Sequence, residues 1–250
     1  MDFNADVYAS DGLYGYFFKY ICEKFIKYTY EYKDLDEFIT KNKISIKVKE
    51  CYTSDLMSQE LRLHKGHITK DFAGKMFRDW RDKERHSHLG VYTEWGLENG
   101  KVTIIRFTLQ IRTAPLCIYI CEKAYDLELV QKEMDWMIKH EIGHMIDYVR
   151  NRHGISVNEF KALCERDQKN YEKYYEHLAT IEEWTTEEAL ADNRRYYEIE
   201  QEATANAAAG IDVSDMIDYE RAFANKYKDK IIGINIHQTG IKEAKKKNES

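Results

Sequence analysis

The sequence is poor in the two residues that most often interrupt regular structure. It has one proline, Pro115, and 12 glycines in 250 residues. Long helices can therefore form, and few signals indicate a boundary between domains. Because 43% of the residues are hydrophobic and 13% are aromatic, a disordered chain is excluded and a packed interior is expected. We expect one globular domain.

Two kinds of targeting segment are also missing from the sequence. No run approaches the roughly 20 uncharged apolar residues that a membrane-spanning helix needs. The first ten residues, MDFNADVYAS, lack the basic and apolar regions of a signal peptide. We therefore expect a cytoplasmic protein without membrane contact. Association with a virus particle or non-classical secretion is compatible with the same features.

Cysteine usage and charge give further exclusions. The five cysteines form no CxxC pair, and their odd number disfavours a disulfide framework and favours a reducing compartment. The formal charge is −6, and the only basic cluster is the terminal KEAKKKNES. Without a sustained basic face, no nucleic-acid partner is expected. We expect residues 236–250 to form a flexible basic tail.

The first half of the sequence alternates between helical and strand patterns. Apolar residues at helical spacing predict a helix from Asp11, its expected cap, to about Lys33, and weak helices are expected at 55–63 and 71–80. Alternation with period two predicts a strand at Lys43–Lys49. Between 91 and 121, VYTEW and VTIIRFTLQIR flank the turn signal LENGK and predict a hairpin, with PLCIYIC as a further strand.

The second half of the sequence is helical in pattern. Apolar positions predict a helix from 126 to about 152, and no strand signal follows Asn158. The run 171–209 contains no proline or glycine and predicts a long helix or a helix pair. The fold class is therefore α+β, with a small mixed or antiparallel sheet, then one long helix, then a mostly helical C-terminal half.

The motif HEIGH lies on the long helix predicted at 126–152. His140 and His144 are four residues apart, so both imidazoles project from one face and can bind one tetrahedral cation. Glu141 is rotated by about 100° from His140 and can take a proton from a water molecule beside the metal. This pattern indicates one zinc ion per chain and hydrolysis of peptide bonds, with Glu141 as the catalytic base.

The third metal ligand has to come from elsewhere in the chain. The extended motif H-E-x-x-H-x-x-G-x-x-H would supply a third histidine ligand from the same segment. It is excluded because Asp147 and Arg150 stand where this motif needs glycine and histidine. A downstream EALAD segment offers Glu188 as a ligand and Asp192 as an acceptor that orients a ligand imidazole. We prefer this pair.

A second segment, EATAN, offers Glu202 as the alternative third ligand, with Asn206 one turn later. Asp192 is preferred to Asn206 as the orienting acceptor because it is charged.

Two other residues of the long helix, Gly143 and Asp147, have features that bear on the site. Gly143 costs about 1 kcal/mol relative to alanine inside a helix, which indicates a close backbone neighbour. Asp147, one turn beyond His144, is expected either to support a ligand or to be an exposed helix acid.

With these segments, HEIGHMIDY and EALADNRR, the chain resembles the glutamate-ligand zincins, or gluzincins, and most closely the catalytic domain of the anthrax lethal factor type. The resemblance covers about residues 100–200. It implies a zincin-like fold and zinc endopeptidase activity on a protein or peptide. Members also carry a tyrosine, one or two turns before the third ligand, that stabilises the oxyanion. Ile181 and Trp184 stand near that place here, so Tyr174, Tyr175 or His177 is the candidate substitute.

The sequence thus predicts a zinc metallo-endopeptidase with a zincin-like catalytic core at 91–235 and an N-terminal layer of the same domain at 1–90. An extended substrate is expected to add a strand to the edge of the sheet built from 91–121. The alternative is a zincin-fold protein that binds zinc as a structural or interaction module, for example in a virus particle, without general protease activity. The oligomeric state stays open.

Overall fold

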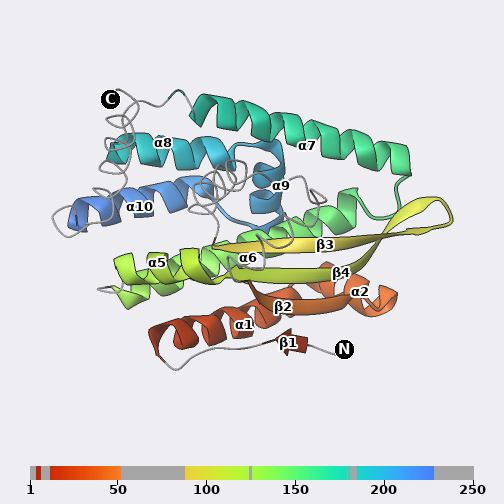
Figure 1. Cartoon of the computed structure of the whole chain (residues 1–250), viewed down its shortest axis with the longest axis horizontal. Helices are drawn as coiled ribbons and strands as arrows, with labels where there is room; N and C mark the ends of the chain where they lie inside the picture. The colour runs from red at the N-terminus through yellow and green to blue at the C-terminus, as the bar shows by residue number, and fades with distance from the viewer. Residues whose placement is uncertain are drawn as a thin grey trace, which may run out of the picture.

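The computed structural model of the chain describes residues 4–6, 12–51, 88–123, 126–178, 180 and 185–227. The helices predicted at 55–63 and 71–80 and the tail at 236–250 lie outside these ranges. Figure 1 shows the order of the elements along the chain. They are β1 (Asn4–Asp6), α1 (Leu13–Glu31), α2 (Lys33–Asn42), β2 (Ser45–Cys51), β3 (Leu89–Glu98), β4 (Lys101–Arg112), α5 (Thr113–Lys123), α6 (Leu127–Asn151), α7 (Val157–Leu178), α8 (Thr186–Tyr197), α9 (Glu200–Ala209) and α10 (Val213–Tyr227).

The four strands within the described ranges form one sheet in the order β1-β2-β4-β3. β1, β2 and β4 run parallel to one another, and β3 pairs antiparallel with β4. Strand β3 is thereby an edge of the sheet among the described residues, and it is the strand nearest to the C-terminal helices (Figure 1). The expected α+β class is confirmed, with a mixed sheet, a long helix after it and a helical C-terminal half.

The β3–β4 hairpin forms where the sequence predicted it. Asn99 and Gly100 connect the strands, and both have positive φ angles, 52° and 76°. A two-residue turn of this kind matches the twist of paired strands, and Asn-Gly is its preferred sequence. Along β4 nearly every second residue is buried, as a half-buried strand requires.

The further strand predicted at PLCIYIC is wrong, because these residues belong to helix α5. Pro115 stands in the first turn of this helix, where its missing N–H has no helical partner to lose. Leu116 and Ile120 are four residues apart and both are fully or almost fully buried. The apolar run therefore supplies one buried face of a helix, a reading that a short apolar run does not distinguish from a strand.

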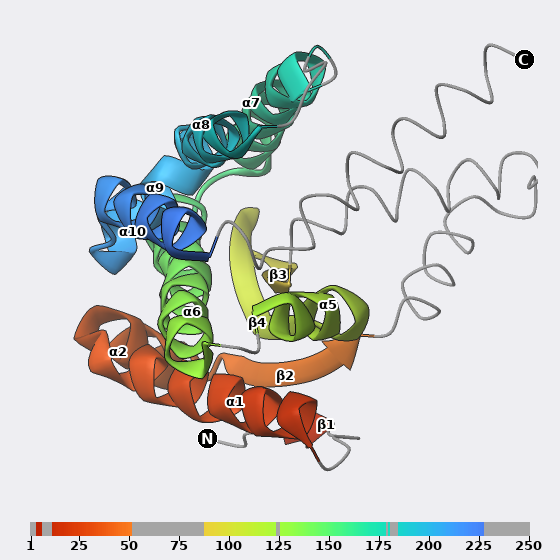
Figure 2. The ribbon, with the colours of Figure 1, turned by 90° about the vertical axis from the view of Figure 1, so that its left-hand side faces the viewer.

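The hydrophobic core lies between the sheet and helices α1 and α6. Aromatic residues of α1 such as Phe17 and Phe25 are fully buried against strand residues such as Phe107 and Leu109, and α6 contributes Met134 and other apolar side chains. Figure 2 shows α1 and α6 together beside the sheet. Helix α1 begins after Gly12, which makes no side-chain cap, and the expected cap Asp11 lies outside the described residues. No helix in the described ranges has the length and apolar character of a membrane span.

Among the described residues after α6, four helices follow one another, α7–α10. The proline- and glycine-free run at 171–209 is divided into parts of three helices, because α8 ends at Tyr197 and α9 begins at Glu200. Helix α9 packs against α6, while α7 and α8 lie farther from the sheet (Figures 1 and 2). The break between α8 and α9 places the acidic residues of the two helices in different environments.

Candidate metal centre

Helix α6 carries the HEIGH motif through the centre of the molecule. Its N-terminus is capped by Asp126, whose side chain accepts a hydrogen bond from the Leu129 amide at 3.1 Å. Such a cap stabilises a helix start by about 1 kcal/mol. His140 and His144 are both buried, each 8% exposed, and their rings lie 4.6 Å apart, centroid to centroid. The predicted common face for the two imidazoles is present.

Helix α9 crosses α6 at Gly143, between the two histidines. A Cβ atom built on Gly143 would lie 2.0 Å from the carbonyl oxygen of Ala205. Only glycine permits the backbones to approach so closely. The close neighbour expected for Gly143 is thus found, and it belongs to α9. This contact brings the side chains of α9 to the histidines.

Glu202 of α9 completes a compact group with the two histidines. Its Oε2 atom lies 2.8 Å from His140 Nε2 and 3.4 Å from His144 Nε2, and the two Nε2 atoms are 3.1 Å apart. Glu202 is only 2% exposed. The three ligand atoms fall within 4.8 Å of one another, so His140, His144 and Glu202, hereafter the metal-ligand group, can hold a metal ion.

Asn206 fixes the orientation of His140. Its Oδ1 atom lies 2.8 Å from His140 Nδ1. An amide oxygen only accepts, so Nδ1 carries the proton and, in the neutral ring, Nε2 presents a lone pair toward Glu202. This is the arrangement in which a neighbouring acceptor selects the tautomer of a metal-binding histidine. The sequence analysis gave this role to Asp192, and the structure gives it to Asn206.

The charges in the group can be balanced by a proton or by a metal ion. A lone pair on His140 Nε2 faces a carboxylate oxygen, and two acceptors at this distance repel unless a proton or a metal ion lies between them. Burial alone would lower the pKa of the His140 imidazole, but Glu202 raises it to about 9. Burial would raise the pKa of Glu202, but the two imidazoles hold it well below its usual range. Two imidazole nitrogens and one carboxylate oxygen suit zinc.

The preference for Glu188 and Asp192 over Glu202 does not agree with this geometry. Glu188 stands in the first turn of α8, where its backbone amide donates to the Thr185 hydroxyl at 3.1 Å. Its carboxylate accepts a hydrogen bond from Arg195 at 2.6 Å. Asp192 is buried and accepts a hydrogen bond from the Tyr174 hydroxyl at 2.9 Å. Of the two acidic segments, the structure brings only the one on α9 to the histidines.

Asp147 is buried, and its side chain contacts residues at the C-terminal end of α6 rather than a metal-ligand residue. It accepts a hydrogen bond from Asn151 at 2.7 Å and pairs with Arg152 at 3.7 Å. Arg152 also bonds Asp167 of α7 at 2.5 Å. Asp147 therefore belongs to a buried charged network that joins the C-terminus of α6 to α7, and the reading as an exposed helix acid is excluded.

Glu141 lies beside the edge strand. Its Oε2 atom accepts a hydrogen bond from the backbone amide of Val91 in β3 at 2.7 Å. This amide therefore points to Glu141 and not to β4, and it lies beside the residue that follows His140. The arrangement places a carboxylate, a candidate metal site and strand β3 together.

Several tyrosines that the sequence did not single out surround the group. The Tyr171 hydroxyl donates to Glu202 Oε1. The ring of Tyr197, at the end of α8, stands 5.9 Å from that of His140, centroid to centroid. Burial, together with the charges of Glu220, Glu202 and other acids, raises the pKa of Tyr197. Tyr197 thus keeps its proton and can donate it in a hydrogen bond. Its place, five residues before Glu202, is visible only once Glu202 is recognised as the ligand.

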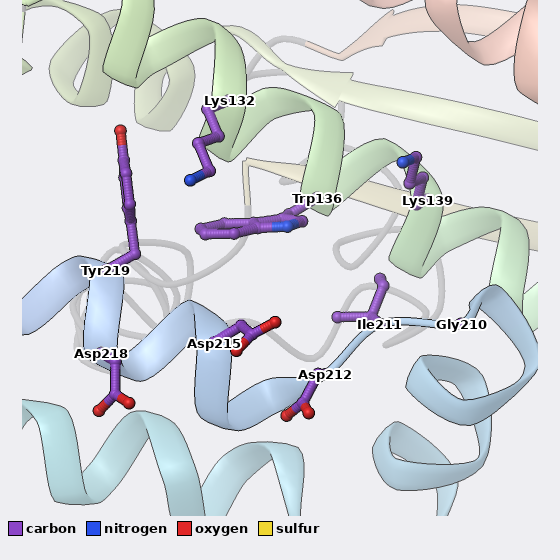
Figure 3. Close-up of a pocket in the computed structure, with 9 residues that line it drawn as sticks. All are labelled: Lys132, Trp136, Lys139, Gly210, Ile211, Asp212, Asp215, Asp218 and Tyr219. Carbon is purple, nitrogen blue, oxygen red and sulfur yellow. The ribbon is translucent and has the colours of Figure 1, made fainter.

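A separate hollow of about 550 Å³ lies between α6 and the start of α10 (Figure 3). Trp136 lies at its centre, with the Lys132 amino group 5.0 Å from its ring and 3.7 Å from that of Tyr219. The hollow contains none of the three metal-ligand residues. Its lining consists of Lys132, Trp136, Lys139, Gly210, Ile211, Asp212, Asp215, Asp218 and Tyr219.

Comparisons with protein-family models, with curated proteins and with solved structures find no match to this chain. The functional argument therefore rests on the site itself.

Proposed function

We propose that this chain is a zinc-dependent metallo-endopeptidase of the gluzincin kind. One observation carries the proposal. Glu141 lies beside the metal-ligand group, and its carboxylate accepts a hydrogen bond from the backbone amide of Val91 in strand β3. A buried metal site alone would serve a structural role equally well. A carboxylate that is not part of the group and that lies beside both the group and strand β3 is the addition that hydrolysis of a peptide requires.

His140, His144 and Glu202 would hold the zinc ion. When bound, zinc lowers the pKa of a water molecule toward neutrality and polarises a carbonyl group. Glu141 accepts the proton of the attacking water and delivers it to the leaving nitrogen. Tyr197 keeps its hydroxyl proton and is the candidate donor to the developing oxyanion. Asn206 holds His140 in the required tautomer.

Strand β3 is the proposed guide for the substrate backbone. The Val91 amide points away from β4, and the amide of Thr93, two residues further along, turns to the same edge. An extended peptide that pairs with this edge is held by main-chain hydrogen bonds, as in other cases of strand addition. Its scissile carbonyl would then pass next to Glu141.

The test combines metal analysis with turnover. The purified chain should contain one zinc per molecule by elemental analysis and should cleave members of a peptide library. Glu141→Gln should keep the zinc and lose cleavage by a factor on the order of a thousand or more, because only the proton acceptor is removed. Glu188→Gln, which removes a carboxylate outside the site, is the matched control and should stay active.

Two results would contradict the proposal. Full activity in Glu141→Gln would exclude the mechanism. Stoichiometric zinc in a chain that cleaves no member of the library would instead favour the structural or interaction module.

A further inference from the structure

The two oxygens of the Glu202 carboxylate lie in different environments. Oε1 accepts a hydrogen bond from the Tyr171 hydroxyl of α7. Oε2 faces the Nε2 atoms of His140 and His144, at 2.8 and 3.4 Å, and no other group within the described ranges bonds to it. A buried carboxylate oxygen without a donor is costly. Oε2 is therefore the oxygen that is open to a metal ion.

The hydrogen bond from Tyr171 holds the carboxylate in this orientation. An ionised carboxylate has no proton to give, so the phenol donates and Oε1 accepts. A hydrogen bond to a charged group is stronger than one between neutral groups. The terminal torsion of a glutamate is soft, so without this bond the carboxylate of Glu202 could turn and present both oxygens to an ion. With it, only Oε2 is presented.

Helix α7 is anchored on both sides of Tyr171. Asp167, Tyr171 and Tyr174 are spaced by four and then three residues, so their side chains lie on one face of the helix. Asp167 bonds Arg152, at the end of α6, at 2.5 Å. The Tyr174 hydroxyl donates to Asp192 of α8 at 2.9 Å. The phenol of Tyr171 therefore comes from a helix whose position relative to α6 and α8 is set by polar contacts.

The number of ligand atoms decides which kind of metal site the group can form. Structural zinc sites are usually closed by four protein ligands, whereas catalytic sites have three and leave a position for water. Two imidazoles and one carboxylate oxygen supply three ligand atoms. A carboxylate that binds through both oxygens would supply a fourth. A contact that keeps Oε1 of Glu202 away from the ion thus preserves the open position.

Building on the zinc site of the proposed function, we propose that Tyr171 is a positioning residue for the third metal ligand. Its hydroxyl holds Oε1 of Glu202 and thereby limits the carboxylate to one ligand atom, Oε2. Tyr171 is not itself a ligand and acts only through Glu202. The metal centre then depends on three helices, because α6 and α9 supply the ligands and α7 sets how one of them binds.

The first test compares two tyrosine variants of the same helix. Tyr171→Phe removes only the hydroxyl that holds Oε1. Tyr174→Phe is the matched control, because it removes a hydroxyl on the same face of α7 that bonds Asp192, a carboxylate outside the metal-ligand group. Both substitutions keep the aromatic ring, and thermal melts of the metal-free chains verify the fold.

The readout of the first test is the spectrum of bound cobalt(II). The visible absorption of this ion weakens as its coordination number rises. In Tyr171→Phe the released carboxylate can bind through both oxygens, so the absorption of the cobalt-loaded chain should fall about twofold or more. Tyr174→Phe should keep the spectrum of the unaltered chain. An unchanged spectrum in Tyr171→Phe would overturn the proposal.

The second test asks whether Tyr171 acts through Glu202. Tyr171→Phe should lower zinc affinity by about tenfold, measured by competition with a metal-binding dye. In a chain that already carries Glu202→Ala, the same substitution should have no further effect, because the carboxylate to be positioned is gone. A merely structural tyrosine would lower the affinity by the same factor in both backgrounds, and that result would also reject the proposal.

The two proposals fail in different ways, because these tests measure metal binding and need no peptide. A chain that binds both metals as expected and cleaves no peptide would contradict the proposed function and leave the role of Tyr171 intact. A chain that cleaves peptides while Tyr171→Phe keeps the cobalt spectrum would exclude only the role of Tyr171. A chain that binds neither metal would exclude both.

Discussion

Glu202 and Asn206 divide two tasks between adjacent turns of α9. The Oε2 atom of Glu202 faces both histidines, and its Oε1 atom accepts a hydrogen bond from the Tyr171 hydroxyl. Asn206 faces the far nitrogen of His140. Glu202 carries the negative charge that a cation needs, and Asn206 orients the neutral imidazole of His140. The two residues should therefore respond differently to substitution.

Removal of the third ligand is the most direct test of the assignment. Glu202→Ala should lower zinc affinity by a factor on the order of a hundred or more, because two imidazoles alone bind the ion weakly. Glu188→Ala should leave the affinity unchanged, since the Glu188 carboxylate bonds Arg195. Competition with a metal-binding dye measures both. Loss of zinc only in the Glu188 variant would show that Glu188, and not Glu202, is the third metal ligand.

Substitution of Asn206 tests the orienting role. Asn206→Leu is of similar size but cannot accept the proton of His140 Nδ1, so zinc affinity should fall by about 10- to 100-fold. Asn206→Asp keeps an acceptor and should retain most of the affinity. If the leucine variant binds zinc as tightly as the unaltered chain, the hydrogen bond has no part in metal binding.

The choice between Glu188 and Glu202 shows what the sequence could and could not predict. The helical spacing of His140 and His144 follows from the motif alone. The third ligand depends on where the downstream helices begin. A readable signal was present: Thr185 precedes Glu188 by three residues, the spacing of a helix-start capping box. The structure accordingly places Glu188 in the first turn of α8.

At the scale of helices and strands, the crossing of α6 and α9 at Gly143 decides the geometry of the centre. Glycine in mid-helix lowers helix stability by about 1 kcal/mol, and here it permits contact with the Ala205 backbone. The hairpin was predictable because Asn99 and Gly100 are specific for its turn. The break between α8 and α9 carries no proline or glycine, so tertiary packing sets it. Helix α5 was missed because a short apolar run does not distinguish a buried helix from a strand.

The close crossing of α6 and α9 predicts that one methyl group added at Gly143 has a large effect on stability. Gly143→Ala would place Cβ 2.0 Å from the Ala205 carbonyl oxygen, so α9 must move away. We expect a loss of about 2 kcal/mol or more in the free energy of unfolding, together with weaker zinc binding. Denaturant titration and zinc competition measure these effects. Ala203→Val adds bulk to the exposed face of α9 and is the control. Unchanged stability and affinity in Gly143→Ala would contradict the close crossing.

At the scale of the whole molecule, zinc should act as a clamp on the folded state. A ligand that binds only the folded chain stabilises it by about 2.7 kcal/mol when its free concentration is 100 times its Kd. Zinc should therefore raise the Tm of the unaltered chain. His140→Ala, which removes a ligand, should show little or no rise. Thermal melts with zinc and with a chelator measure the difference, and equal rises in both proteins would place the ion elsewhere.

The position of α9 in the chain has a consequence for the order of events during synthesis. The two histidines of α6 leave the ribosome before Glu202, and the whole of α7 and α8 is made between them. A nascent chain that lacks α9 has only the two imidazoles to offer and no Asn206 to set the tautomer of His140. Tight metal uptake therefore waits until α9 has been made and docked. Under the proposed function, hydrolytic competence would arise late, after most of the described fold already exists, and the unfinished chain would be protected from its own chemistry.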